Sequence, residues 1–199
     1  MWLPPEESHH ALHVLRVGHL DMITVSDGEG RVARCAVVSS EGDVARAEIL
    51  ESRTHRPLRP RLVVYQGAAK GSKLDTVVER LAERWASIAR SAAKQSRNPF
   101  VMKTGAGFGF EDLVGRVRSE PQAVVLWEEA SLPLRTALDD VSERVALVVG
   151  PEGGLERGEA EALADAGGQL VSLGPRILRT ENAAVATAAA LLFHYGLIG

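Results

Sequence analysis

Four apolar segments that lack polar–apolar alternation constrain the fold of this 199-residue chain most strongly. They are residues 61–65 (RLVVY), 123–127 (AVVLW), 145–149 (VALVV) and 169–173 (QLVSL). A strand that is apolar on both faces is buried on both faces, as in a parallel sheet covered by helices. The chain must therefore supply helices for two sides of a sheet.

Helical periodicity between and after these segments predicts such helices. The patterns cover residues 74–88, 156–166 and 180–195, and the pair Gly167-Gly168 ends the second of them. Strands that alternate with helices are typical of an α/β domain. We therefore expect residues 59–199 to form an α/β domain with a mostly parallel sheet.

The first part of the chain has a different pattern. Short segments at 22–26, 31–39 and 44–52 are separated by glycine-containing turns and predict the strands of a small β-barrel or meander. A short helix is expected over 7–16, with Leu12 and either Leu15 or Val14 facing inward. Two prolines within 56–60 form a stiff connector, so we place a domain boundary after residue 58.

Composition excludes several classes of protein. An apolar content of 45% and a charged content of 25% predict a packed core rather than disorder. The only cysteine, Cys35, cannot form an internal disulfide, and the N-terminus lacks the features of a signal peptide, so a reduced, cytoplasmic protein with a buried thiol is expected. The longest apolar stretch, 183–193, is too short to span a bilayer, and no membrane partner is expected.

Charge is distributed unevenly along the chain. The net charge is −3, yet residues 84–103 contain basic residues and no acidic ones. Arg90, Lys94 and Arg97 have i, i+4, i+7 spacing and therefore share one face of a helix. A solvated surface and a phosphate-binding face are both compatible with this pattern.

The turn Gly150-Pro151-Glu152-Gly153-Gly154 follows the third apolar segment and matches neither common phosphate-binding motif. Its glycines suit a tight strand-to-helix connection, and they equally let a ligand approach the backbone. Glu152 in the turn, with Glu128 and Glu129 after a neighbouring strand, disfavours an anionic ligand and favours a cationic one. S-adenosylmethionine fits because its sulfonium is positive and it carries no phosphate.

A second loop, residues 173–182 (LGPRILRTEN), precedes the last helix. Thr180 is expected to cap that helix, and Glu181 to interact with its dipole. His9 and His13 share a face of the first helix, but no second cluster of ligands accompanies them, so no metal is expected.

Two motifs now give a specific resemblance. LVVGPEGGL (147–155) and LGPRILRTENAAVATAAALL (173–192) resemble the SPOUT superfamily of methyltransferases, and most closely the RsmE family, which methylates N3 of a uridine in 16S ribosomal RNA. HHALHVLRVG (9–18), KGSKLDTVVERLAE (70–83) and RWASIARSAAKQSR (84–97) also resemble that family, so the similarity covers nearly the whole chain.

The resemblance implies a fold and an activity. Residues 1–58 would form a PUA-like β-barrel that binds RNA, and residues 59–199 a SPOUT domain with a trefoil knot. The protein would be an S-adenosylmethionine-dependent rRNA (uridine-N3) methyltransferase that acts on 16S rRNA or the small ribosomal subunit. It would work as a homodimer with the last helix near the interface. The alternative is an RNA- or ribosome-binding module of the same fold without methyltransferase activity.

The positions of residues within these motifs suggest a hypothesis for their roles. Arg179 would neutralise negative charge on the uracil ring, Arg97 would orient the RNA, and Glu181 or Glu152 is a candidate base. RNA binding would involve Arg16, Lys70, Arg90, Lys94 and Arg97. The cofactor would contact Leu126, Trp127, Glu128, Val149, Gly150, Pro151, Glu152, Gly153, Gly154, Leu173, Gly174, Ile177, Leu178, Arg179, Thr180, Asn182 and Ala183.

This chain departs from the family pattern at two places. The family usually has a few dozen residues between the two helical segments that meet here at Glu83 and Arg84. Either a βα segment has been lost, or a segment is absent from the chain as given; we favour the second, because losing a strand would damage the core. Asn182 stands where the family often has threonine, a change between two small polar residues.

Overall fold

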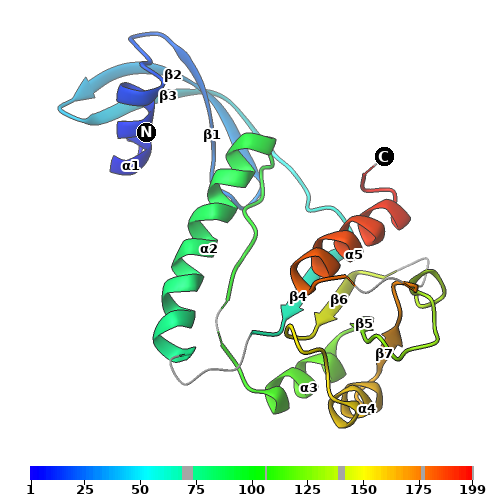
Figure 1. Ribbon diagram of the computed structural model, residues 1–199. Coiled ribbons are helices and arrows are strands. Elements are labelled where there is room, and N and C mark those ends of the chain that lie inside the picture. The colour runs from blue at the N-terminus through cyan, green and yellow to red at the C-terminus, as the bar shows by residue number, and fades with distance from the viewer. Residues whose placement is uncertain (69–73, 106, 139–141, 176–177, 199) are drawn as a thin grey trace. The chain divides into compact units, whose positions relative to one another are not determined.

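The computed structural model describes residues 1–68, 74–105, 107–138, 142–175 and 178–198, and for residues 74–82 the backbone alone. Contacts divide the chain into two compact units (Figure 1). Unit 1 combines residues 1–57 with 80–105, and unit 2 combines 58–79 with 106–199. The first break falls next to the expected boundary, while residues 80–105, which the sequence analysis places in the second domain, group with the first unit. The assignment of RNA binding and methyl transfer to separate domains stays a prediction.

Unit 1 is built on an antiparallel sheet with the order β1-β2-β3. Its strands are β1 (Met22–Ser26), β2 (Arg31–Glu41) and β3 (Val44–Thr54), all at or close to their expected positions. Irregularities in the pairing of β2 with β3 occur between Arg34 and Cys35 and between Val37 and Ser39. Such bulges add local bend and twist to a sheet.

The N-terminal helix packs on one end of this sheet. It consists of α1 (Pro5–His9) and a π-helical turn, η1 (His10–Val14). Leu12 packs against the core as expected, whereas Val14 and Leu15 are exposed, so the alternatives offered for a second inward residue are both wrong. The buried Ser8 hydroxyl explains the docking, because it donates to Leu3 O and accepts from the Ala45 amide, each at 3.1 Å.

Cys35 lies on β2 with no exposed surface, as expected for a structural thiol. Burial raises the pKa of this thiol, so the reactive thiolate is disfavoured at neutral pH.

Unit 2 contains the expected parallel sheet. Its strands are β4 (Arg61–Gln66), β5 (Ala123–Leu126), β6 (Arg144–Val149) and β7 (Gly168–Val171), in the order β4-β6-β5-β7. All three pairings are parallel. The absence of alternation is explained by burial, since residues 145–149 are at most 3% exposed.

Helices cover both faces of this sheet (Figure 1). One face packs against α5 (Thr180–His194), through a core that includes Leu147, Val171 and Leu191. The other face packs against α3 (Phe110–Ser119) and α4 (Arg157–Asp165), through a core that includes Val125, Val148 and Leu163. The sequence analysis did not identify α3.

The segment around the junction of Glu83 and Arg84 is one continuous helix, α2 (Leu74–Ser96). The backbone passes through the junction without interruption, and the described part of unit 2 contains one sheet of four parallel strands. No helix within the described ranges is both long enough and apolar enough to cross a membrane.

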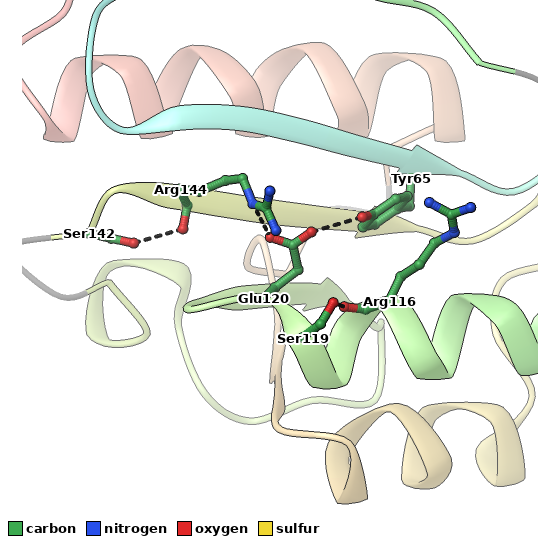
Figure 2. Close-up of polar contacts among 6 residues, drawn as sticks. All are labelled: Tyr65, Arg116, Ser119, Glu120, Ser142 and Arg144. Carbon is green, nitrogen blue, oxygen red and sulfur yellow. Dashed lines mark hydrogen bonds and ion pairs between the residues drawn. The ribbon is translucent and has the colours of Figure 1, made fainter.

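A buried carboxylate ties α3 to the sheet. Glu120 follows α3, and its side chain is 3% exposed (Figure 2). Tyr65 Oη on β4 donates to Glu120 Oε1 at 2.8 Å, and Arg144 Nε on β6 donates to Glu120 Oε2 at 2.5 Å. Burial and the hydrogen bond to Glu120 raise the pKa of Tyr65, so its phenol remains a donor at neutral pH. Both carboxylate oxygens are thus satisfied.

We expect Glu120→Ala to lower the free energy of unfolding by about 2 kcal/mol, since it leaves a half-buried phenol without its acceptor and a half-exposed guanidinium without its partner. Urea denaturation measures the change. The control is Glu143→Ala, which removes an exposed carboxylate paired with Arg59 and should cost less than about 0.5 kcal/mol. Equal effects of the two substitutions would contradict a structural role for Glu120.

Candidate functional site

The loops that follow the strands of unit 2 meet at the carboxyl edge of the sheet, around residues 149–151. The amide of Gly67, just after β4, donates to Val149 O at 2.7 Å, and Gln66 Nε2 donates to Gly150 O at 3.3 Å. Thr180 Oγ1, at the start of α5, donates to Pro151 O at 3.1 Å. The two motifs singled out in the sequence are therefore in direct contact.

The glycines of this region serve different purposes. A Cβ on Gly67 would lie 2.5 Å from Pro151 N, and a Cβ on Gly154 would lie 2.9 Å from Glu128 Oε1. Gly154 also has φ +76°, which side chains rarely adopt. A Cβ on Gly153, by contrast, would have no atom within 4 Å of it among those considered for the other glycines. Packing against the Pro151 backbone thus requires glycine at position 67, the positive φ favours glycine at position 154, and Gly153 leaves the backbone open to a ligand.

Carboxylates surround the turn as the sequence predicts. Glu128 lies against Gly154, and Glu152 is exposed within the turn. Glu129 is paired with Arg157, whose guanidinium lies 5.8 Å from the centre of the Trp127 ring. Within the described ranges, no basic side chain pairs with Glu128 or Glu152. This part of the site is therefore suited to a positively charged group.

A cavity of about 480 Å³ lies beside α5, within the size range of small-molecule sites. Its walls come from the segment around the 3-10 helix η2 (Leu134–Thr136), from the loop after β7, and from α5. The residues that line it are Pro133, Leu134, Arg135, Ser172, Leu173, Gly174, Leu178, Ala186, Thr187 and Ala190. Three predicted cofactor residues, Leu173, Gly174 and Leu178, are among them.

Thr187 is the unusual member of this lining. It is fully buried, and its hydroxyl oxygen has no hydrogen-bond partner within the part of the chain that the structure describes. An unpaired buried hydroxyl costs free energy, of the order of 1–3 kcal/mol.

The start of α5 differs from expectation in one respect. Arg179, not Thr180, occupies the N-cap position, and no side chain caps the helix there. Thr180 is the first helical residue, and its hydroxyl donates to Pro151 O. Arg179, Glu181 and Asn182 are exposed, while Ala183 and Val149 are buried in the core and offer a ligand only their backbone.

The other predicted site residues are distributed as follows. Leu126 and Trp127 end β5 and are half-buried. The predicted RNA-binding residues Arg16, Arg90, Lys94 and Arg97 belong to unit 1 and are exposed. Lys94 Nζ is bound to both oxygens of Glu7 on α1, at 2.6 and 2.9 Å, so it has an acidic partner that the sequence did not suggest. Lys70 and Ile177 lie outside the described residues.

Sequence reasoning missed several residues of the site. Gln66 and Gly67 follow an apolar strand, and the position of glycine at a strand end was a usable signal. Arg135 and Thr187 carried no signal, because an isolated arginine in a loop and a threonine among alanines are ordinary in sequence. Within the described ranges, no group of three or more His, Cys, Asp or Glu side chains could hold a metal ion.

Comparison with known proteins adds to this geometry. A family model described as an RNA methyltransferase domain matches residues 61–192. The ribosomal RNA small subunit methyltransferase E of Mycobacterium bovis is 32% identical over 211 positions, covering 90% of this chain and 80% of the relative. The Bacillus subtilis protein of the same name is 28% identical and covers 97% of this chain and 90% of the relative. Because 211 positions exceed the chain's 199 residues, the relative carries residues that this chain lacks.

A solved structure agrees. The ribosomal RNA small subunit methyltransferase E of Neisseria gonorrhoeae, bound to S-adenosyl methionine, has a TM-score of 0.84 and 26% identity, covering 97% of this chain and 91% of that one. The family model spans most of the chain, and the mycobacterial relative exceeds 30% identity over nine-tenths of it. The chain therefore belongs to the ribosomal RNA small subunit methyltransferase E family, within the RNA methyltransferase domain proteins.

Proposed function

We propose that this protein transfers a methyl group from S-adenosylmethionine to N3 of a uridine in 16S rRNA of the small ribosomal subunit. The observation that carries the proposal is the hydrogen bond from Thr180 Oγ1 to Pro151 O, which joins the two motif loops beside a ligand-sized cavity. The names of the relatives and the cofactor-bound relative of known structure support the same reaction.

The residues present fit the cofactor. The cavity lining is mainly apolar, as a nucleoside ring requires. Gly153 leaves backbone open at the neighbouring turn, and Glu128 and Glu152 supply negative charge near it. When bound, S-adenosylmethionine would supply an electrophilic methyl group on a positively charged sulfur.

The chain's own residues would prepare the uridine. N3 of uridine carries a proton, which a base must accept before or during attack on the methyl carbon. Glu152 and Glu181 are exposed carboxylates at the two motif loops and are the candidate bases. Arg179, exposed at the N-cap of α5, would stabilise the negative charge that develops on the uracil ring.

RNA binding would be assigned to unit 1. We infer a PUA-like domain there, supported by the three-stranded antiparallel sheet and by the exposed Arg16, Arg90 and Arg97. A trefoil knot is inferred for unit 2 from family membership, and the contact of α5 with the turn after β6 is consistent with it. A protein that modifies ribosomal RNA would act in the cytoplasm.

The first test is methyl transfer from labelled S-adenosylmethionine to small ribosomal subunits that lack their own methylation, with the product nucleoside identified by mass spectrometry. We expect N3-methyluridine. A different methylated nucleoside would contradict the proposed substrate. Cofactor binding without any transfer would favour an RNA-binding module that has lost its activity.

Arg179→Ala should lower kcat about 100-fold, since a guanidinium at a developing anion acts mainly in the transition state. The Kd for S-adenosylmethionine should change less than about threefold. Single-turnover kinetics and calorimetry measure the two quantities. Arg118→Ala, an exposed arginine on α3, is the matched control and should leave both unchanged. Loss of cofactor binding in Arg179→Ala, with kcat preserved at saturation, would refute the assigned role.

A homodimer through α5 is also proposed. The helix buries Thr187 and Leu191 against the sheet, yet Val185 and Phe193 are 71% and 69% exposed. A helix that is apolar all round is normally covered on more than one face. The other face of α5 would therefore be covered by a second copy of the chain.

We expect Phe193→Glu to shift the protein from dimer to monomer in sedimentation equilibrium, because a charge would be buried in the contact. Val14→Glu introduces the same charge at an exposed apolar position of unit 1 and serves as control. A wild-type protein that sediments as a monomer, or a Phe193→Glu variant that remains dimeric, would contradict the proposed interface.

A further inference from the structure

Arg135 is the one charged residue among the described residues that line the cavity beside α5. Leucine, proline and alanine side chains make up most of the remaining wall. Arg135 is exposed, and no described residue forms an ion pair with it. The cavity therefore offers a ligand an apolar interior and a single positive charge.

The backbone of Arg135 is held firmly to the sheet. Its 3-10 helix is closed by the bonds from Thr136 Oγ1 to Pro133 O at 2.7 Å and from the Ala137 amide to Leu134 O at 3.0 Å. Ala137 is 2% exposed, and its carbonyl accepts from the buried Gln122 Nε2 at 3.0 Å. The base of the arginine is thus fixed against the core.

A second set of contacts joins the same segment to the loop after β7. Pro133 forms a parallel bridge with Ser172, and the Ser172 amide donates to Leu132 O at 2.9 Å. Leu173 and Gly174, which line the cavity, follow directly. Arg135 and the opposite wall are therefore held in one arrangement, which is the condition for selective recognition.

Charge decides which group Arg135 would bind. S-adenosylmethionine has two cationic groups, the sulfonium and the ammonium, and one anionic group, the carboxylate of its amino-acid part. The carboxylates of Glu128 and Glu152 would attract the cationic groups, and a guanidinium forms its strongest hydrogen bonds with a carboxylate. We propose that Arg135 binds the carboxylate of the cofactor and selects cofactors that carry one. This inference rests on the proposed function and adds the orientation of the cofactor to it.

The test compares two ligands in isothermal titration calorimetry. S-adenosylhomocysteine carries the carboxylate, and decarboxylated S-adenosylhomocysteine lacks only that group. Arg135→Gln should weaken binding of the first ligand roughly tenfold and change binding of the second less than about twofold. Arg118→Gln is the control with a similar exposed arginine on α3 and should alter neither affinity. The thermal midpoint of the ligand-free variant should stay unchanged, because Arg135 has no described partner to lose.

The outcomes separate the two levels of inference. If Arg135→Gln weakens the binding of both ligands equally, or leaves the affinity for S-adenosylhomocysteine unchanged, the proposed role of Arg135 is wrong. The proposed function would stand in either case, provided that the wild-type protein binds S-adenosylhomocysteine. Failure of the wild-type protein to bind S-adenosylhomocysteine would overturn the proposed function and, with it, this inference.

Discussion

The arrangement of the site depends on the three successive carbonyl groups of residues 149–151. They lie at the end of the buried central strand β6 and accept hydrogen bonds from two other elements. Gly67 and Gln66 donate to Val149 O and Gly150 O from the β4 side, and Thr180 on α5 donates to Pro151 O. Since a Cβ on Gly67 would lie 2.5 Å from Pro151 N, no larger residue can replace this glycine without moving the turn. The geometry of the site is thus set by backbone proximity.

Electrostatic complementarity gives this scaffold its chemistry. Negative side chains gather at the turn after β6 and the end of β5, while the cavity on the α5 side has a cation at its wall. A zwitterionic ligand with a large apolar part would find matching groups for each of its charges. A nucleotide would instead bring phosphates close to Glu152, which is why the usual function of a glycine-rich turn does not apply.

Much of unit 2 could be predicted from the sequence. The strands without alternation appear where expected, because burial on both faces leaves a continuous apolar run, as in residues 145–149. The helix after Gly153-Gly154 also appears where expected. Helix α3 was missed, since its short amphipathic segment follows a glycine-rich stretch that resembles a loop. Strand order was beyond sequence reasoning, because nothing in a strand says which neighbour it will have.

The site was predictable only in part. Its motif loops have distinctive compositions, and the structure brings Pro151 and Thr180 together. Thr180 itself was assigned the wrong local role, because N-cap preference is a local rule, whereas here the hydroxyl donates to a tertiary acceptor, Pro151 O, from the first helical position. Only the structure shows that Arg135 and Thr187 both lie at the cavity.

The two faces of the sheet differ in how completely their polar groups are satisfied. On the α3 side, Glu120 engages Tyr65 and Arg144 and leaves neither of its oxygens free (Figure 2). On the α5 side, the Thr187 hydroxyl has no partner among the described residues and Phe193 is exposed. Substitutions intended to raise the thermal stability of the enzyme should therefore be made around α3 and α4. A substitution along α5 that replaces Thr187 or Phe193 risks removing a feature that binding uses.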